Sequence, residues 1–166
     1  MIGKDGLLSG DVPDDNDAGP HDRQWEAHYL LYVDGRAAID AGEFEQAIEL
    51  LTQSLRLHPH AKTLELLGEC HLKLGRPFEA LMHAAASVGM QTVGVRNRLI
   101  LARALVELSH FDAAKETLRE ALLKKPDFKT AAIFLAQLER AHPCELDEQR
   151  SEKVWQNVLK REWREI

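Results

Sequence analysis

The sequence predicts an all-α protein, a stack of three helical hairpins, because three sets of small residues recur with the same period. The sets are Gly35, Gly68 and Ala102; Gly42, Gly75 and Ser109; and Ala47, Ala80 and Ala114. Within each set the steps are 33 and then 34 residues, which indicates a repeated pair of helices. Small side chains let antiparallel helices approach closely, so the first and third sets are expected at helix contacts. The middle set is expected at the turn inside each hairpin.

Length and composition indicate the general class of protein. With 166 residues, 45% of them hydrophobic and 29% charged, the chain is expected to form one globular domain. No apolar run approaches the roughly 18 residues of a membrane helix, and the N-terminus lacks the apolar core of a secretory signal, which favours a cytoplasmic protein. Cys70 and Cys144 show no metal-ligand spacing and are interpreted as reduced thiols. A net charge of −6 disfavours nonspecific nucleic-acid binding.

Residues 1–23 are predicted to be a disordered acidic tail. Six aspartates stand against Lys4 and Arg23, and glycine and proline are frequent. Such a segment buries too little apolar surface to offset the entropy lost on ordering it. The folded part is therefore predicted to cover residues 24–141.

The first repeat is placed at about residues 28–60. Its first helix is expected to run from Gln24 to Ala41 with one apolar stripe, and Gly42 ends it. The second helix runs from Phe44 to Leu57 and is closed by Pro59. The predicted stripe of the first helix consists of Trp25, Tyr29, Tyr32, Val33 and Ala37.

The second and third repeats are placed at about residues 61–94 and 95–128. In the second repeat Thr92 replaces the proline that ends the other two. We therefore expect Gly89 to end its second helix early and the loop through Gly94 to be looser.

A capping helix is predicted over residues 129–141, with Asp127 as its N-cap, because the last repeat of a stack leaves an apolar edge uncovered. Residues 142–166 are predicted to form an amphipathic helix. It either extends the cap or contacts a partner or a second copy. Its stripe consists of Trp155, Leu159 and Trp163.

These hairpins resemble the tetratricopeptide repeat family. The resemblance extends roughly from Tyr29 to Pro126, although the second repeat has Pro77 ahead of its aromatic residue and lacks the closing proline. It implies a right-handed superhelix whose concave groove, lined by the first helix of each repeat, binds a peptide or helix of a partner protein. The segments that carry it are Gly42 to Ile48, Leu57 to Pro59, Ser109 to Ala114, and Pro126.

If the first helices line a groove, its arginines favour a partner segment that is acidic or mixes acidic and apolar residues. Residues 1–23 are a possible intramolecular competitor for it. Alternatively, Arg36 and Arg103 merely pair with Glu65 and Glu69 between repeats. The predicted groove residues are Tyr32, Arg36, Ile39, Glu65, Glu69, Leu72, Lys73, Arg96, Leu99, Arg103 and Val106.

One subset of the family grips the terminal carboxylate of heat-shock chaperones with Lys, Asn and Arg side chains. Only Arg96 keeps this chemistry here, so that ligand is not expected. The five matching positions hold Tyr32, Arg36, Leu66, Arg96 and Ile100.

No cofactor, metal or catalytic role is predicted. Cys70 is interpreted as a small core residue, since no acid–base arrangement accompanies it. Glu65 and Glu69 are interpreted as charge partners of nearby cations rather than as a catalytic pair. The histidines without metal-ligand spacing are His58, His60, His71 and His83.

The function predicted from the sequence is that of a non-catalytic protein-interaction module, an adaptor or scaffold. Two alternatives remain open: a small client-specific chaperone of the secretion type, and an accessory subunit that docks through Trp155 and Trp163. A homodimer is possible in each case.

Overall fold

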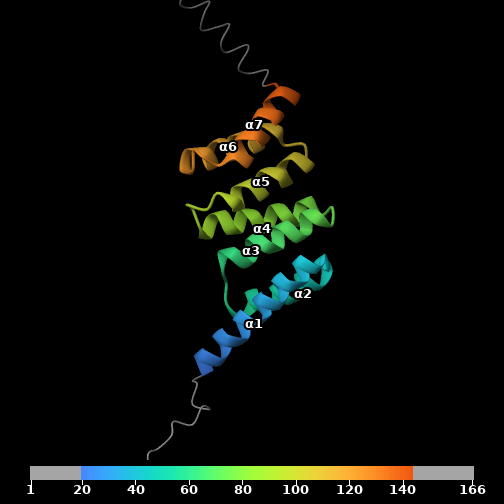
Figure 1. Ribbon diagram of the computed structural model, residues 1–166, viewed down its shortest axis with the longest axis vertical. Coiled ribbons are helices and arrows are strands. Elements are labelled where there is room, and N and C mark those ends of the chain that lie inside the picture. Colours follow the sequence, from blue (N-terminus) through green and yellow to red (C-terminus); the bar gives the residue numbers. More distant parts are fainter. Residues whose placement is uncertain (1–19, 144–166) are drawn as a thin grey trace, which may run out of the picture.

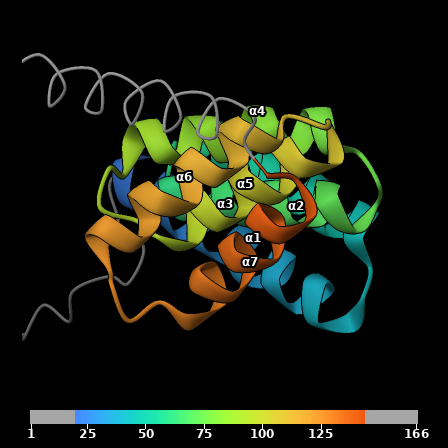
Figure 2. The same cartoon turned by 90° about the horizontal axis from the view of Figure 1, so that it is seen from above.

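The computed structural model describes residues 20–143, and these form a single stack of seven helices without a strand (Figures 1 and 2). Helices that follow one another in sequence pack side by side, and α3 also contacts α1 and α5. None of the helices in this part of the chain is long and apolar enough to cross a bilayer. The helices are α1 (Pro20–Ala41), α2 (Phe44–Leu57), α3 (Ala61–Lys73), α4 (Pro77–Met90), α5 (Arg96–Glu107), α6 (Phe111–Lys124) and α7 (Lys129–Ala141).

The small residues lie at helix contacts, as the sequence predicts. A Cβ atom added to Gly35 would stand 2.8 Å from Cγ of Leu51, which belongs to the second helix of the same hairpin. One added to Gly68 would stand 3.2 Å from Cγ2 of Ile100, in the next hairpin. Ala102 is fully buried. Larger side chains at these positions would therefore push the helices apart.

The turns inside the hairpins share a left-handed residue, which ends the first helix of each. Gly42 has φ of 80° and Gly75 has φ of 66°, values that glycine adopts without a steric penalty. Ser109 occupies the same position in the third hairpin with φ of 62°. The predicted equivalence of these three residues is confirmed.

The core consists of two clusters along the stack. The first joins the first hairpin to α3 through Leu51 and Leu67, and the second joins α5, α6 and α7 through Leu118 and Leu138. Gly68 and Ile100 pack against each other between the two clusters. The stack is therefore held by contacts between neighbouring repeats, as in other repeat proteins.

A buried serine ties the two helices together in each of the first two hairpins. The Ser54 hydroxyl donates to the carbonyl oxygen of His28 at 3.1 Å, and the Ser87 hydroxyl donates to that of Ala61 at 2.8 Å. The two partners are 26 residues apart in both cases. The third hairpin has Ala121 at this position, which cannot make the bond.

The first helix differs from its predicted form. It begins at Pro20 rather than Gln24, so residues 20–23 belong to the helix instead of the tail. The predicted stripe is not the buried face, because Trp25, Tyr29 and Val33 are exposed. Gly35 and Ala38 face the core instead. The acidic segment 1–19 and the predicted helix with Trp155, Leu159 and Trp163 lie outside the described residues.

Two expectations about helix ends, and one about the loop through Gly94, are wrong. Gly89 does not shorten α4, which runs through it and has 14 residues, as α2 has. The loop after it is tied rather than loose, because the Asn97 amide donates to the Gln91 carbonyl and the Arg98 guanidinium donates to the Gly94 carbonyl at 2.6 Å. Asp127 does not cap α7, whose N-cap is Phe128.

Candidate partner-binding groove

A cleft of about 560 Å³ opens between α3, α5 and α7. These are the first helices of successive units of the stack, which is where the sequence places the groove (Figure 1). α3 contributes its last two residues, α5 contributes residues from its second half, and α7 contributes residues between Thr130 and Gln137. The lining residues are Leu72, Lys73, Arg103, Val106, Glu107, Thr130, Ile133, Phe134 and Gln137.

The cleft combines an apolar floor with free cations. Leu72, Val106 and Phe134 are half-buried, and the Ile133 side chain is 60% exposed. Lys73 and Arg103 form no ion pair with any residue between 20 and 143. This arrangement suits a segment that presents apolar side chains next to a carboxylate.

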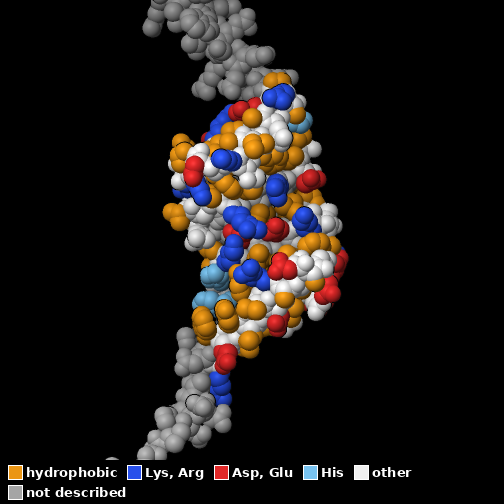
Figure 3. All heavy atoms as spheres, in the orientation of Figure 1, with side chains coloured by type: hydrophobic (Ala, Val, Ile, Leu, Met, Phe, Trp, Pro, Cys, Tyr) orange, Lys and Arg blue, Asp and Glu red, His pale blue; other side chains and the backbone are white. Residues whose placement is uncertain are grey.

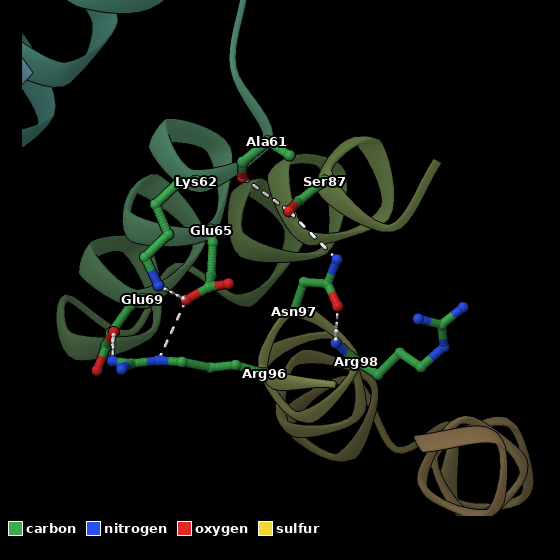
Figure 4. A network of polar contacts seen from close by, with 8 residues as sticks. All are labelled: Ala61, Lys62, Glu65, Glu69, Ser87, Arg96, Asn97 and Arg98. Carbon is green, nitrogen blue, oxygen red and sulfur yellow. Dashed lines mark hydrogen bonds and ion pairs between the residues drawn. The ribbon is translucent and has the colours of Figure 1, made fainter. Parts of the chain in front are cut away.

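At the other end of α3 and α5 the charges are neutralised within the molecule. Arg96 Nη2 lies 2.8 Å from Glu69 Oε2, and Arg96 Nε lies 3.2 Å from Glu65 Oε1 (Figure 4). Lys62 Nζ approaches the same Glu65 oxygen at 2.6 Å. The hydrogen bond to Glu69 is the main cause of a raised pKa of Arg96. Figure 3 shows such blue and red side chains side by side over the middle of the stack.

The alternative pairing expected from the sequence is wrong. Glu65 and Glu69 bind Arg96 and Lys62, whereas Arg36 and Arg103 make no ion pair within the described part of the chain. The reason is register: Arg96 is the first residue of α5 and reaches across to Glu65 and Glu69, in the second and third turns of α3. Arg103 lies two turns further along and reaches the cleft instead.

The other predicted groove residues divide between core and surface. Leu99 is buried in the second core cluster, and Tyr32 and Ile39 are half-buried against the first. Arg36 is exposed on α1. Of the predicted set, the structure brings Leu72, Lys73, Arg103 and Val106 together in the cleft.

Sequence reasoning missed the contribution of α7 to the cleft, because this helix was assigned only a capping role. A signal was present: Ala136 follows Ala102 by 34 residues and continues the first set of small residues. That register marks α7 as the first helix of a further unit. Thr130, Ile133, Phe134 and Gln137 should then face the groove.

The positions that correspond to the chaperone-tail clamp do not form one. Leu66 and Ile100 are buried apolar residues, and Arg96 is engaged by two glutamates. A carboxylate ligand at Arg96 would have to displace both.

Two other kinds of site considered from the sequence are a reactive cysteine and a metal centre. Cys70 is fully buried in the first core cluster, and burial raises the pKa of its thiol to about 11. It therefore stays protonated and unreactive at neutral pH. Within residues 20–143 no group of three His, Cys, Asp or Glu side chains has the geometry to hold a metal ion.

The chain belongs to the tetratricopeptide repeat family, because the model of this family matches residues 32–89 and 100–143. No curated protein sequence matches the chain.

Several solved structures share the fold. The TPR domain of Arabidopsis OM64 is similar with a TM-score of 0.68 and 22% identity, over 70% of this chain and 98% of that one. The first TPR domain of Spaghetti (RPAP3), bound to an HSP90 peptide, gives 0.68 and 16%, over 70% and 93% of the two chains. The Yersinia enterocolitica type III secretion chaperone SycD, in complex with a peptide of the translocator YopD, gives 0.64 and 19%, over 70% and 92%.

Proposed function

We propose that this protein is a non-catalytic interaction module whose cleft between α3, α5 and α7 binds a segment of a partner protein. The observation that carries the proposal is the pairing of an apolar floor with the unpaired cations Lys73 and Arg103. The related TPR domain of RPAP3 and the chaperone SycD, each solved with a bound peptide, support this use of the fold.

The charge distribution indicates the chemistry of the partner. Since Arg96 is neutralised by Glu65 and Glu69, the cations of α3 and α5 that have no ion pair with a described residue are Lys73 and Arg103, both in the cleft. Glu107 also lines the cleft, so a uniformly acidic segment fits less well than one with a carboxylate beside apolar side chains. Rigid helices hold these groups in place, so most of the entropy lost on binding comes from the partner.

Selection from a random peptide library tests this proposal. Peptides selected on the wild-type chain should carry Asp or Glu next to Leu, Ile or Phe. Lys73→Glu/Arg103→Glu should weaken their binding by at least about tenfold, or about 1.4 kcal/mol, because attraction becomes repulsion.

The matched control is Arg56→Glu, an exposed arginine on α2 away from the cleft, which should leave affinity unchanged. Peptides without acidic residues, or equal loss in the control, would contradict the proposal. The client-chaperone and accessory-subunit hypotheses stay predictions, and Trp155 and Trp163, on which the second depends, lie outside the described residues.

A further inference from the structure

The first hairpin has a face that no other residue between 20 and 143 covers. In α3 and α5 the equivalent face packs on the preceding repeat, and its residues Thr63, Leu66, Cys70, Asn97, Ile100 and Ala104 are buried. The matching positions of α1 hold Leu30, Val33 and Ala37, followed by Ala41, and all four are exposed. We call this the N-terminal face.

A terminal repeat normally carries polar residues on its outer side, which keeps the stack soluble. Here Leu30 is 55% exposed and Val33 is 41% exposed. These large apolar side chains stand where later repeats bury theirs against a neighbour. The N-terminal face is therefore built like an internal interface.

The N-terminal face is bulky at one end and hollow at the other. Leu30 and Val33 project from its first half. Its second half borders a hollow of about 430 Å³, lined by Ala37 and Ala41 of α1 and by Leu50 of α2. A surface with one protruding half and one recessed half is complementary to itself when one copy is reversed.

We propose that the N-terminal face binds the same face of a second copy of this chain, with the two α1 helices antiparallel. A twofold axis near Val33 and Asp34 places Leu30 of each copy over the hollow at Ala37 of the other. A parallel pairing would set Leu30 against Leu30 and leave both hollows empty. The inference does not depend on the partner-binding cleft, which lies between other helices.

Charge complementarity supports the antiparallel arrangement. Arg23 is exposed at the beginning of α1, and Glu43 lies on the rim of the hollow at the other end. Neither has an ion-pair partner among residues 23–143. With a rise of about 1.5 Å per residue along a helix, reversing one copy brings Arg23 within side-chain reach of Glu43 of the other.

The chain's own ends are less suitable occupants. Residues 1–19 carry five aspartates and one lysine, and Asp34 and Glu43 border the hollow, so that like charges would oppose docking. α7, the last described helix, lies at the opposite end of the stack from α1 (Figure 1). A second copy brings an apolar side chain, Leu30, to the hollow, and a cation, Arg23, which the hollow's own lining lacks.

Sedimentation equilibrium of the full chain tests the proposal. The mass should rise with concentration from 18.8 kDa towards twice that value. Leu30→Glu should hold the chain at the monomer mass with an unchanged helical circular dichroism spectrum. Leu123→Glu, at an apolar residue of α6 that is 83% exposed, is the matched control and should still dimerise.

A monomer at every concentration, or a dimer that survives Leu30→Glu, would overturn the proposal. The first outcome would leave the N-terminal face to the chain's own residues or to another protein.

Two further variants test the orientation. Arg23→Glu should weaken dimerisation by about tenfold, and the added change Glu43→Arg should restore it. In a Cys144→Ser background, a mixture of Leu30→Cys and Ala37→Cys chains should form an intermolecular disulfide. Leu30→Cys chains alone should not, and efficient cross-linking between them would overturn the antiparallel arrangement.

Discussion

Ser109 adopts a backbone conformation that glycine fills in the other two hairpins. Its φ of 62° lies in the left-handed region, where an L side chain costs about 1–2 kcal/mol. Glycine loses more entropy on folding, which offsets part of this difference. We expect Ser109→Gly to raise the free energy of unfolding by about 0.5–1 kcal/mol, measured by urea denaturation.

The reciprocal changes serve as controls. A Cβ atom at Gly42 or Gly75 would meet no other atom within 4 Å, so substitution there tests conformation and not packing. Gly42→Ser and Gly75→Ser should each destabilise the protein by about 1 kcal/mol. If Ser109→Gly also destabilised it, the hydroxyl would have to make a compensating contact.

At the scale of single elements, α3 and α4 share a histidine pair that makes their packing depend on pH. The rings of His71 and His83 are stacked with centroids 5.2 Å apart, and His71 Nδ1 is buried without a hydrogen-bond partner in the described part of the chain. Burial is the main cause of a lowered pKa in both, and His83 lowers that of His71 further. Arg76 acts in the same direction on His71, while Glu79 opposes it.

The sign of the pH effect follows from these shifts. Below the ordinary histidine pKa of about 6.5, the unfolded chain binds protons at these two histidines and the folded chain does not. The free energy of unfolding therefore decreases as the pH is lowered. The fall should continue until the pH reaches the lowered pKa values of the folded state. We expect a lower urea midpoint at pH 5.5 than at pH 7.5.

His71→Leu removes one of these groups and should reduce the difference between the two midpoints, whatever its effect on absolute stability. An unchanged difference would assign the pH dependence to other groups.

The elements themselves were largely predictable, whereas their contacts across repeats were not. Phe44–Leu57 begins and ends where apolar periodicity, Gly42 and Pro59 place it, because these are local signals. Trp25 and Tyr29 follow the same periodicity but remain exposed, since periodicity does not say whether a neighbour exists to cover a stripe. Which glutamate pairs with Arg96 depends on the offset of α5 relative to α3 along the helix axes. No local sequence pattern encodes that offset.

At the scale of the whole molecule, stability should vary along the stack. Each helix packs mainly on its neighbours, and α3, α4 and α5 lie in the middle of the stack, furthest from its two ends. We therefore expect their amide hydrogens to exchange most slowly and those of α7 to exchange faster, measured by hydrogen–deuterium exchange with mass spectrometry. Equal protection along the chain would indicate a single cooperative unit instead.

The contact of Arg96 with Glu65 and Glu69 makes the two edges of the inner surface different in charge. One edge, at the beginnings of α3 and α5, is closed by internal ion pairs, while the other edge offers Lys73 and Arg103. A ligand with a carboxylate at one terminus would thus place that terminus at Lys73 and Arg103 and be held in a single direction. Reversing the order of residues in such a ligand, with its composition unchanged, would abolish recognition.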